Sequence, residues 1–302
     1  MKKTWIVGTR GSKLALRQTQ IVVDALREAN PGHEFSIRTI RTTGDTIWDK
    51  PLAEIGGKGL FVKEIEEELV RGGIDIAVHS MKDLPAELAG DLVVGAVMVR
   101  EDPRDAFVST RLKSIRELHS GSRVGTGSTR RKAQLMRYRE GVDVVPLRGN
   151  VDTRMRKLTA ENLDGIILAA AGIRRLGLEK VITEMIPAEI MVPTAGQGAI
   201  GIEIRRGDEA AGLLGAIDHD RTHREVAIER AVQAAVGGGC SIPLGIHARI
   251  EDDGIDLSLS LGNEEGVILV HEKLSGKPGG EQALIEKASR ILLKHMDTGY
   301  GL

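Results

Sequence analysis

Short apolar runs alternate with helix-period segments along the first hundred residues. Trp5-Ile6-Val7 precedes a predicted helix that begins at the N-cap Ser12 and ends at Pro31-Gly32. The apolar residues of this helix recur on one stripe, at Leu14, Ile21, Val22, Ala25 and Leu26. A strand near 35–40, a helix near 60–70 and strands at 74–78 and 92–98 follow. This β/α alternation favours a parallel or mixed sheet with helices on both faces.

A similar alternation restarts after the acidic, proline-containing stretch at 101–104, which we read as a crossover into a second α/β domain. Helices are predicted from Ser128 and from Val151, between strands at 106–108, 123–125, 142–147 and 164–170. The segment 193–198 then leads into an apolar run at 199–204, which is a candidate return strand into the first domain.

The pattern changes from about residue 220. A helix over 222–236 leads into Gly237-Gly238-Gly239-Cys240, after which apolar and polar residues alternate strictly over 246–250 and 255–261. Period-2 strands joined by turns at Asp253-Gly254 and Glu265-Gly266 predict an antiparallel meander with one solvated face. A closing helix carries Leu284, Ala288, Ile291 and Leu292 on one stripe.

Composition narrows the class of protein. The 302 residues carry 42 Lys+Arg against 43 Asp+Glu, and aromatic residues make up 2%. Neither the net basic face nor the stacking aromatics of a nucleic-acid binder are present. A single cysteine excludes an intramolecular disulfide framework and a Cys-rich zinc module, and the longest apolar runs are too short for a signal peptide or a membrane span. We therefore expect a cytoplasmic protein.

Basic residues gather where predicted strands meet helices, in the segments Thr9–Ser12, Val124–Arg131 and Leu147–Arg154. Ligands of α/β proteins bind at the carboxyl ends of strands, beside helix N-termini whose free N–H groups favour anions. Arginine adds a planar fork that binds carboxylate or phosphate through two hydrogen bonds. Any one of these arginines could be a solvated surface residue, but three such clusters together predict a polyanionic ligand.

Two glycine-rich segments resemble nucleotide-binding motifs but lack a required residue. Gly125–Arg130 has an arginine in place of the third glycine of a dinucleotide fingerprint, and Gly56–Gly59 lacks the Ser/Thr of a P-loop. His219 and His223 are one helical turn apart, but the glutamate of a metalloprotease motif is missing, so we predict a surface pair at a helix start and no metal site.

Two other segments offer reactive groups. A buried strand delivers His79, Ser80, Lys82 and Asp83 to its carboxyl end. Asp83 there could stabilise a cationic intermediate or relay protons, or it could merely cap the Leu84-Pro85 turn. Cys240 could be a small buried hydrophobe, the commonest role of free cysteine, or an accessible thiol in a glycine-rich loop.

Long strings of residues resemble one family, porphobilinogen deaminase (hydroxymethylbilane synthase). The matching segments cover almost the whole chain: Thr9–Leu16, Gly56–Glu64, Asp75–Pro85, Arg100–Phe107, Pro193–Glu203 and Gly238–Gly245. The resemblance implies a transferase that joins four porphobilinogen molecules head to tail, releasing ammonia, to give the linear tetrapyrrole hydroxymethylbilane.

The resemblance also implies the fold and its division. We expect two α/β domains with mixed sheets, similar to periplasmic binding proteins, and a C-terminal α+β domain with a three-stranded antiparallel sheet. The first domain would comprise 1–98 plus 197–216, the second 102–192 and the third, with the cofactor cysteine, 218–302.

Site residues carry over by motif. Cys240 would hold a dipyrromethane cofactor through a thioether, and Asp83 would be the catalytic carboxylate. The cofactor carboxylates would be bound by Lys82, Ser128, Arg130 and Arg131. The substrate and growing chain would be bound by Arg10, Ser12, Arg148, Arg154 and Arg175. Lys58 and Phe61 would lie in an active-site loop.

The alternative from another class is a non-catalytic two-domain protein that binds anions or carboxylates. Cys240 discriminates between the two, because a binding protein needs no covalent handle. As partners we expect the small molecule porphobilinogen, with neither nucleic acid nor membrane, and we expect a monomer.

Overall fold

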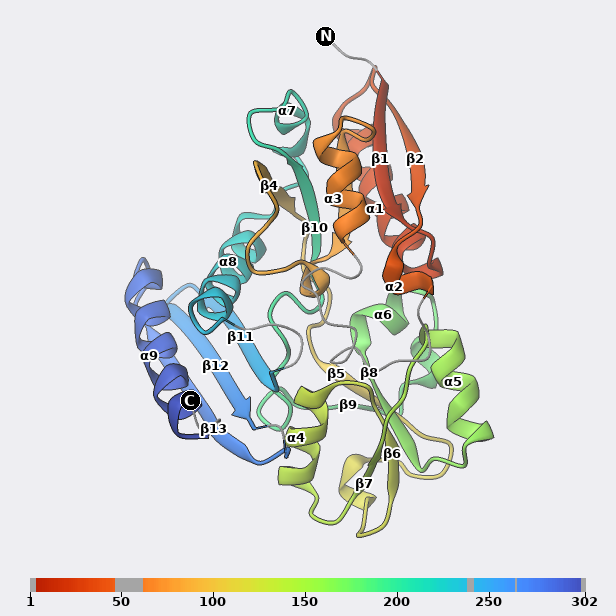
Figure 1. The fold of residues 1–302 in the computed structure, drawn as a ribbon, viewed down its shortest axis with the longest axis vertical. Coiled ribbons are helices and arrows are strands. Elements are labelled where there is room, and N and C mark those ends of the chain that lie inside the picture. The colour runs from red at the N-terminus through yellow and green to blue at the C-terminus, as the bar shows by residue number, and fades with distance from the viewer. Residues whose placement is uncertain (1–3, 47–61, 238–241, 264, 300–302) are drawn as a thin grey trace. The chain divides into compact units, whose positions relative to one another are not determined.

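The computed structural model describes residues 4–46, 62–237, 242–263 and 265–299 (Figure 1). The chain divides into two compact units. Unit 1 comprises 1–101 and 198–224, and unit 2 comprises 102–197 and 225–302. The predicted three-domain boundaries stay a prediction, and each unit is described by itself.

Unit 1 is built on a mixed five-stranded sheet in the order β2-β1-β3-β10-β4. Strand β1 runs parallel to β2 and β3, whereas β10 runs antiparallel to β3 and β4. The return strand considered at 199–204 therefore forms, and it lies inside the first sheet. The strands are β1 (Thr4–Arg10), β2 (Glu34–Ile40), β3 (Ile76–Ser80), β4 (Leu92–Val97) and β10 (Ile200–Arg205).

Helices cover both faces of this sheet, and its central strands β3 and β10 are accordingly buried on both sides. On one face, Val22 and Leu26 of α1 (Lys13–Ala29) pack with Ile202. On the other, Ile65 of α3 (Lys63–Val70) packs with Ala77. The shorter elements are α2 (Thr43–Thr46), the 3-10 helix η1 (Met81–Asp83) and α7 (Ala211–Leu214).

Unit 2 contains a second mixed sheet in the order β7-β6-β8-β5-β9. Strand β6 is parallel to β7 and β8, and β5 is antiparallel to β8 and β9. The strands are β5 (Asp105–Val108), β6 (Arg123–Gly125), β7 (Asp143–Val145), β8 (Gly165–Ala169) and β9 (Glu184–Met185). The helices are α4 (Thr129–Tyr138), α5 (Val151–Ala160), α6 (Ala170–Arg175) and the 3-10 turns η2 (Ile115–Glu117) and η3 (Glu179–Val181).

The predicted meander is the antiparallel sheet β11-β12-β13, which also belongs to unit 2. Its strands are β11 (Leu244–Glu251), β12 (Gly254–Gly262) and β13 (Ile268–Gly276). The alternating residues Ile246, Ala248 and Ile250 share a core with Leu284 and Leu292 of α9 (Glu281–Gly299). The first turn lies at 252–253, one residue before its predicted place.

Helix α8 (Asp220–Ala235) joins this sheet through two carboxylates as well as through apolar packing. Glu229 is fully buried and accepts hydrogen bonds from the backbone N–H groups of Ala248, at 2.9 Å, and Gly196, at 2.7 Å. Glu225 accepts one from Ile250 at 3.0 Å. These carboxylates satisfy buried backbone donors, so we read them as structural.

Candidate active site

The carboxyl edge of the first sheet brings together residues from two predicted clusters. Arg10 ends β1 and Ser12 follows it, and Asp83 follows β3. Because β1 and β3 are parallel, their carboxyl ends lie at the same edge of the sheet. A pocket opens there, and its lining residues are Arg10, Ser12, Leu14, Ala15, Gln18, Val62, Val78, His79, Ser80 and Asp83.

Asp83 is half-buried in the wall of this pocket, at the end of η1. The turn that follows is closed by the backbone, since the N–H of Leu84 bonds to the carbonyl of Met81. No hydrogen bond joins the Asp83 carboxylate to any residue that the structure describes. The turn-capping role considered for Asp83 is therefore not supported, and Asp83 lines the pocket together with Arg10.

The neighbouring polar groups of the pocket are held by one another. The Ser80 hydroxyl donates to Oε1 of buried Gln18 at 3.0 Å. Ser12 caps α1, because its Oγ accepts from the Ala15 N–H at 3.2 Å. The N-terminus of a 17-residue helix therefore points its partial positive charge at the pocket.

A buried group of titratable residues lies under α3 in the same unit. His79 Nε2 is 3.0 Å from Glu203 Oε2, and the side chains are 4% and 0% exposed. Glu66, on α3, is also buried. Burial and the nearby Glu203 carboxylate raise the pKa of Glu66 above its ordinary value.

The carboxyl edge of the second sheet carries the remaining predicted arginines. Arg130 and Arg131 follow β6, Arg148 and Arg154 follow β7, and Arg175 ends α6 after β8. Because β6 is parallel to both neighbours, these positions lie at one edge. The arginines predicted at strand ends thus lie at one edge of the second sheet, and Arg10 lies at the corresponding edge of the first.

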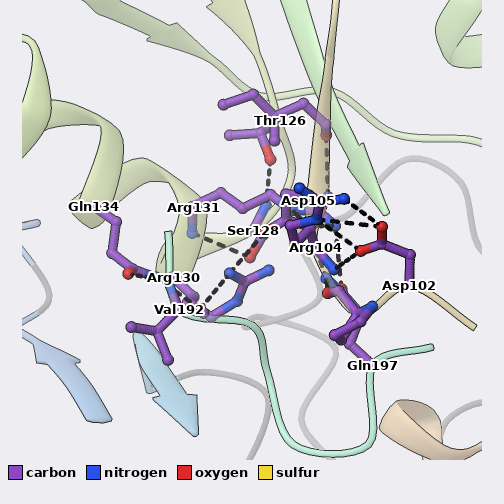
Figure 2. A network of polar contacts seen from close by, with 12 residues as sticks. Asp102, Arg104, Asp105, Thr126, Ser128, Arg130, Arg131, Gln134, Val192 and Gln197 are labelled. Atoms are coloured by element: carbon purple, nitrogen blue, oxygen red, sulfur yellow. Dashed lines mark hydrogen bonds and ion pairs between the residues drawn. The ribbon is translucent and has the colours of Figure 1, made fainter. Parts of the chain in front are cut away.

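Arg130 and Arg131 converge on one buried carboxylate, Asp105 (Figure 2). Nη1 of Arg130 lies 2.8 Å from Asp105 Oδ2, and Nε of Arg131 lies 3.0 Å from Oδ1. Gln197 donates to the same Oδ1 at 2.9 Å. The guanidinium groups also donate to backbone carbonyls, Arg130 to Val192 at 2.8 Å and Arg131 to Ile167 at 3.0 Å.

This arginine cluster (Asp105, Arg130, Arg131 and Gln197) holds two cations against one anion. Although burial opposes ionisation, the two guanidinium groups hold the pKa of Asp105 well below its ordinary value. Burial lowers the pKa of Arg130, and Asp105 counteracts this. Nε and Nη2 of Arg130 have no hydrogen-bond partner among the described residues. Arg130 is 4% exposed, and its remaining N–H donors can bind the carboxylates of a ligand. A dipyrromethane carries such carboxylates, so these residues fit that cofactor.

The other residues at this edge sit at helix starts. Ser128 caps α4 and accepts from the Arg131 N–H at 3.4 Å. Asn150 caps α5 by accepting from Thr153 at 2.9 Å, and Arg154 Nε donates to the Gly149 carbonyl at 2.8 Å. Gly149 has φ +112°, a conformation that favours glycine and lets the chain turn tightly before α5.

Three predicted site residues, Cys240, Lys58 and Phe61, lie outside the described residues. Lys82 lies in η1, two residues after the end of β3, and is not among the residues that line the pocket. The sequence prediction missed Asp105 and Gln197, which bind the arginines, and Glu203, which binds His79. No local pattern marks them, because their partners lie far along the chain.

Comparison with family models identifies the family of the protein that contains these two sheet edges. Residues 5–212 match the model described as "Porphobilinogen deaminase, dipyromethane cofactor binding domain", and residues 223–298 match that described as "Porphobilinogen deaminase, C-terminal domain". The chain belongs to the porphobilinogen deaminase family. The resemblance on which the sequence prediction rested is confirmed.

Curated porphobilinogen deaminases align over nearly the full chain. That of Pelotomaculum thermopropionicum is 47% identical, covering 100% of this chain and 96% of its own. That of Syntrophus aciditrophicus is 45% identical, covering 97% and 99%. The chain is therefore a transferase of tetrapyrrole biosynthesis that condenses porphobilinogen into hydroxymethylbilane with a dipyrromethane cofactor, and the alternative of a non-catalytic binding protein is not favoured.

Among solved structures, the methionine-binding protein MetQ gives a TM-score of 0.47 at 15% identity, covering 76% of this chain and 95% of its own. The fold class does not depend on that likeness. The two mixed five-stranded sheets and the three-stranded antiparallel sheet confirm the predicted architecture of the chain. None of the described helices is long and apolar enough to cross a membrane.

Proposed function

We propose that the pocket of unit 1 binds the reacting pyrroles, with Asp83 as the catalytic carboxylate. The observation that carries this proposal is the Asp83 side chain itself, which lines the pocket and has no hydrogen-bond partner among the described residues. A half-buried carboxylate held ready in a pocket is typical of a functional group, since structural carboxylates are usually engaged by their own fold.

The neighbours of Asp83 suit a pyrrole that carries acetate and propionate groups. Arg10 supplies a guanidinium for a substrate carboxylate, and Ser12 and the N-terminus of α1 add hydrogen-bond donors and a favourable field. Asp83 then accepts hydrogen bonds from pyrrole N–H groups and stabilises the positive charge that develops on the ring as ammonia departs.

Asp83→Asn tests this role. The amide keeps the size and polarity of the side chain but removes its charge, so we expect turnover to fall about 10²–10³-fold, as for the loss of one preorganised electrostatic group. Folding and cofactor loading should persist. The measurement is the steady-state rate of hydroxymethylbilane formation by protein whose intact mass shows the loaded cofactor.

Asp91→Asn is the matched control, because Asp91 lies in the same unit on an exposed surface and pairs only loosely with Arg206 at 3.3 Å. It should leave turnover unchanged. Turnover of Asp83→Asn within a factor of two of the parent would exclude Asp83 from the chemistry and with it the proposed function of the pocket.

The arginines divide by environment. We assign Arg130, Arg131 and Ser128, with Lys82 of unit 1, to the cofactor carboxylates, and Arg148, Arg154 and Arg175 to the substrate and the growing chain. Support for the first assignment is the cationic excess of the arginine cluster and the spare donors of Arg130. When bound, the dipyrromethane supplies the pyrrole ring to which the first unit is added.

Cys240 is proposed to hold that cofactor through a thioether, and Lys58 and Phe61 to belong to an active-site loop. These assignments rest on the motifs Gly238–Gly245 and Gly56–Glu64. Intact-mass spectrometry of freshly prepared enzyme should show one added dipyrrole, and Cys240→Ser should show the bare chain and no activity. Fully active protein with the unmodified mass would contradict the assignment.

We further propose a cytoplasmic monomer of three domains that uses neither nucleic acid nor membrane. The net charge of −1 and the 2% aromatic content support the absence of a nucleic-acid partner. Light scattering at enzyme concentrations used in assays should give the mass of a single chain, whereas a stable dimer would contradict it.

A further inference from the structure

The buried group under α3 brings together three titratable side chains from three elements. His79 comes from β3, Glu203 from β10 and Glu66 from α3. All three residues are buried, at 6%, 0% and 7% exposure. Ala77 and Ile65 pack on the same side of the sheet, so this polar group is set into an otherwise apolar interface. Burying ionisable groups there is costly unless they are used or compensated.

The geometry fixes the histidine from one side only. Nε2 of His79 bonds to Glu203 Oε2 at 3.0 Å, whereas Nδ1 has no hydrogen-bond partner among the described residues. A carboxylate bound to one ring nitrogen orients the imidazole and stabilises its protonated form, while the other nitrogen is left to exchange a proton.

The charges around His79 favour this use. Glu203 faces it from β10 and Glu66 from α3, while Arg10 and Asp83 line the pocket with it. Burial and the Glu203 carboxylate raise the pKa of Glu66, which favours its neutral form. The carboxylate that contacts the His79 ring is that of Glu203, at 3.0 Å from Nε2.

The condensation needs a group that accepts and then returns a proton. Of the titratable side chains that line the described pocket, Arg10 stays protonated and Asp83 is assigned to stabilise positive charge. Histidine is the side chain whose protonation changes near neutral pH. His79 is therefore the group of this pocket best suited to carry a proton.

We propose that His79 carries the proton released in each addition to the departing ammonia, and that Glu203 is the positioning residue that orients it. This inference rests on the proposed function of the pocket as the site of the reacting pyrroles.

Atoms and electrons balance in this step. The incoming aminomethyl group enters protonated, as an ammonium. Its C–N bond breaks, and ammonia leaves with the electron pair. The free α carbon of the acceptor pyrrole supplies the electron pair of the new C–C bond to the methylene carbon. The α C–H bond then breaks, its electrons restore the ring, and its proton passes to Nδ1 of His79. His79 gives that proton to ammonia, which departs as ammonium, and returns to its neutral form.

Two variants of the holoenzyme test the proposal. His79→Gln should lower single-turnover rates by about 10²-fold, the lower range for loss of a general base. It should also remove the acidic limb of the pH–rate profile, which is the fall in rate at low pH. In this variant no histidine remains that must be neutral to accept the proton. Porphobilinogen deuterated at its free α carbon should then give a primary isotope effect larger than in the parent enzyme.

Glu203→Gln separates positioning from packing. The amide can still accept the hydrogen bond from Nε2, but it cannot stabilise a protonated ring, so the acidic limb should move to lower pH. His33→Gln is the matched control: His33 accepts from Trp5 Nε1 at 3.0 Å, away from the pocket, and glutamine can accept in its place. Its profile and isotope effect should equal those of the parent.

An unchanged acidic limb and isotope effect in His79→Gln would overturn the proposal. If that variant does not fold, Glu203→Gln decides, since an unmoved limb there overturns it equally. Asp83→Asn tests the pocket separately. If turnover collapses in Asp83→Asn while the pH–rate profile of His79→Gln equals that of the parent, the role of His79 as proton carrier is rejected and the proposed function of the pocket is retained.

Discussion

The two units bury charge at their sheet edges in opposite ways. In unit 2, Arg130 and Arg131 surround Asp105, so two permanent cations enclose one anion. In unit 1, Glu203 and Glu66 lie with His79, so the buried groups are ones that gain and lose protons. The first arrangement is built on guanidinium groups, which keep their charge at any physiological pH, whereas the second contains a histidine, the residue type that can change its charge near neutral pH.

The difference fits the two roles proposed for these groups. A cofactor that stays bound through every addition needs an anchor of fixed charge, which guanidinium groups provide. A reaction that releases a proton in every cycle needs groups whose protonation changes. Substitutions in each unit can test this contrast.

Asp105→Asn should have the largest effect on stability. It leaves two buried guanidinium groups without their carboxylate, which typically costs about 3–5 kcal/mol. The pKa of Asp105 is lowered in the folded state. Its contribution to the free energy of unfolding is therefore complete when the pH is above the ordinary aspartate pKa, and it is lost only when the pH falls through the lowered pKa. The loss of unfolding free energy, measured by urea denaturation, should therefore be the same from about pH 5 to pH 8.

Asp256→Asn is the control in the same unit, because Asp256 pairs with Lys273 on the surface at 2.8 Å. An exposed pair contributes at most about 1 kcal/mol. If the two variants lost the same free energy of unfolding, the burial of Asp105 between the arginines would add nothing to the stability that a surface ion pair gives.

Arg130→Leu and Arg154→Lys should separate anchoring from elongation. Arg130→Leu removes the spare donors of the arginine cluster, so we expect bare apoenzyme. Arg154→Lys keeps the charge but loses the two-pronged geometry, so we expect loaded enzyme that stalls or starts slowly. The measurement is the ladder of intact masses after porphobilinogen is added. If both variants stayed bare, or both ran the full ladder, the division would be wrong.

Glu66→Gln should have the smallest effect and the opposite sign. The pKa of Glu66 is raised in the folded state. Its contribution to stability is therefore present when the pH is below the ordinary glutamate pKa, and it is lost as the pH rises through the raised pKa. Glutamine removes that loss, so the variant should gain stability relative to the parent as pH rises from 4.5 towards neutral. Thermal unfolding at a series of pH values checks this. Exposed Glu67→Gln, on the same helix, should give no such gain.

Local pattern was enough to predict most of the fold. The stripe of α1 and the alternation at 246–250 and 255–261 each report burial of one face, and that periodicity is set by the chain itself. The two-residue strand β9 and the short helices α6 and α7 were missed, because they are too brief to show a period. The direction of β10 was also open, since no local pattern distinguishes parallel from antiparallel pairing.

The candidate site divides in the same way. Strand-end residues such as Arg130 and Asp83 were predictable because the β/α order places strand ends at one edge. Their partners were not predictable: Gln197 reaches Asp105 across 92 residues, and Glu203 reaches His79 across 124. Contacts of that range depend on the sheet order, which only the folded chain reveals.

The place of β10 also sets an order of assembly. During synthesis β3 and β4 emerge before residues 102–197, and the strand that joins them emerges only afterwards. All strands of the second mixed sheet therefore leave the ribosome before the first sheet can close. Until then β4 lacks its partner strand and β3 has an open edge, and unpaired edges of this kind invite association with other chains. A nascent chain halted before residue 198 is thus the form of this protein most exposed to aggregation and most dependent on chaperones.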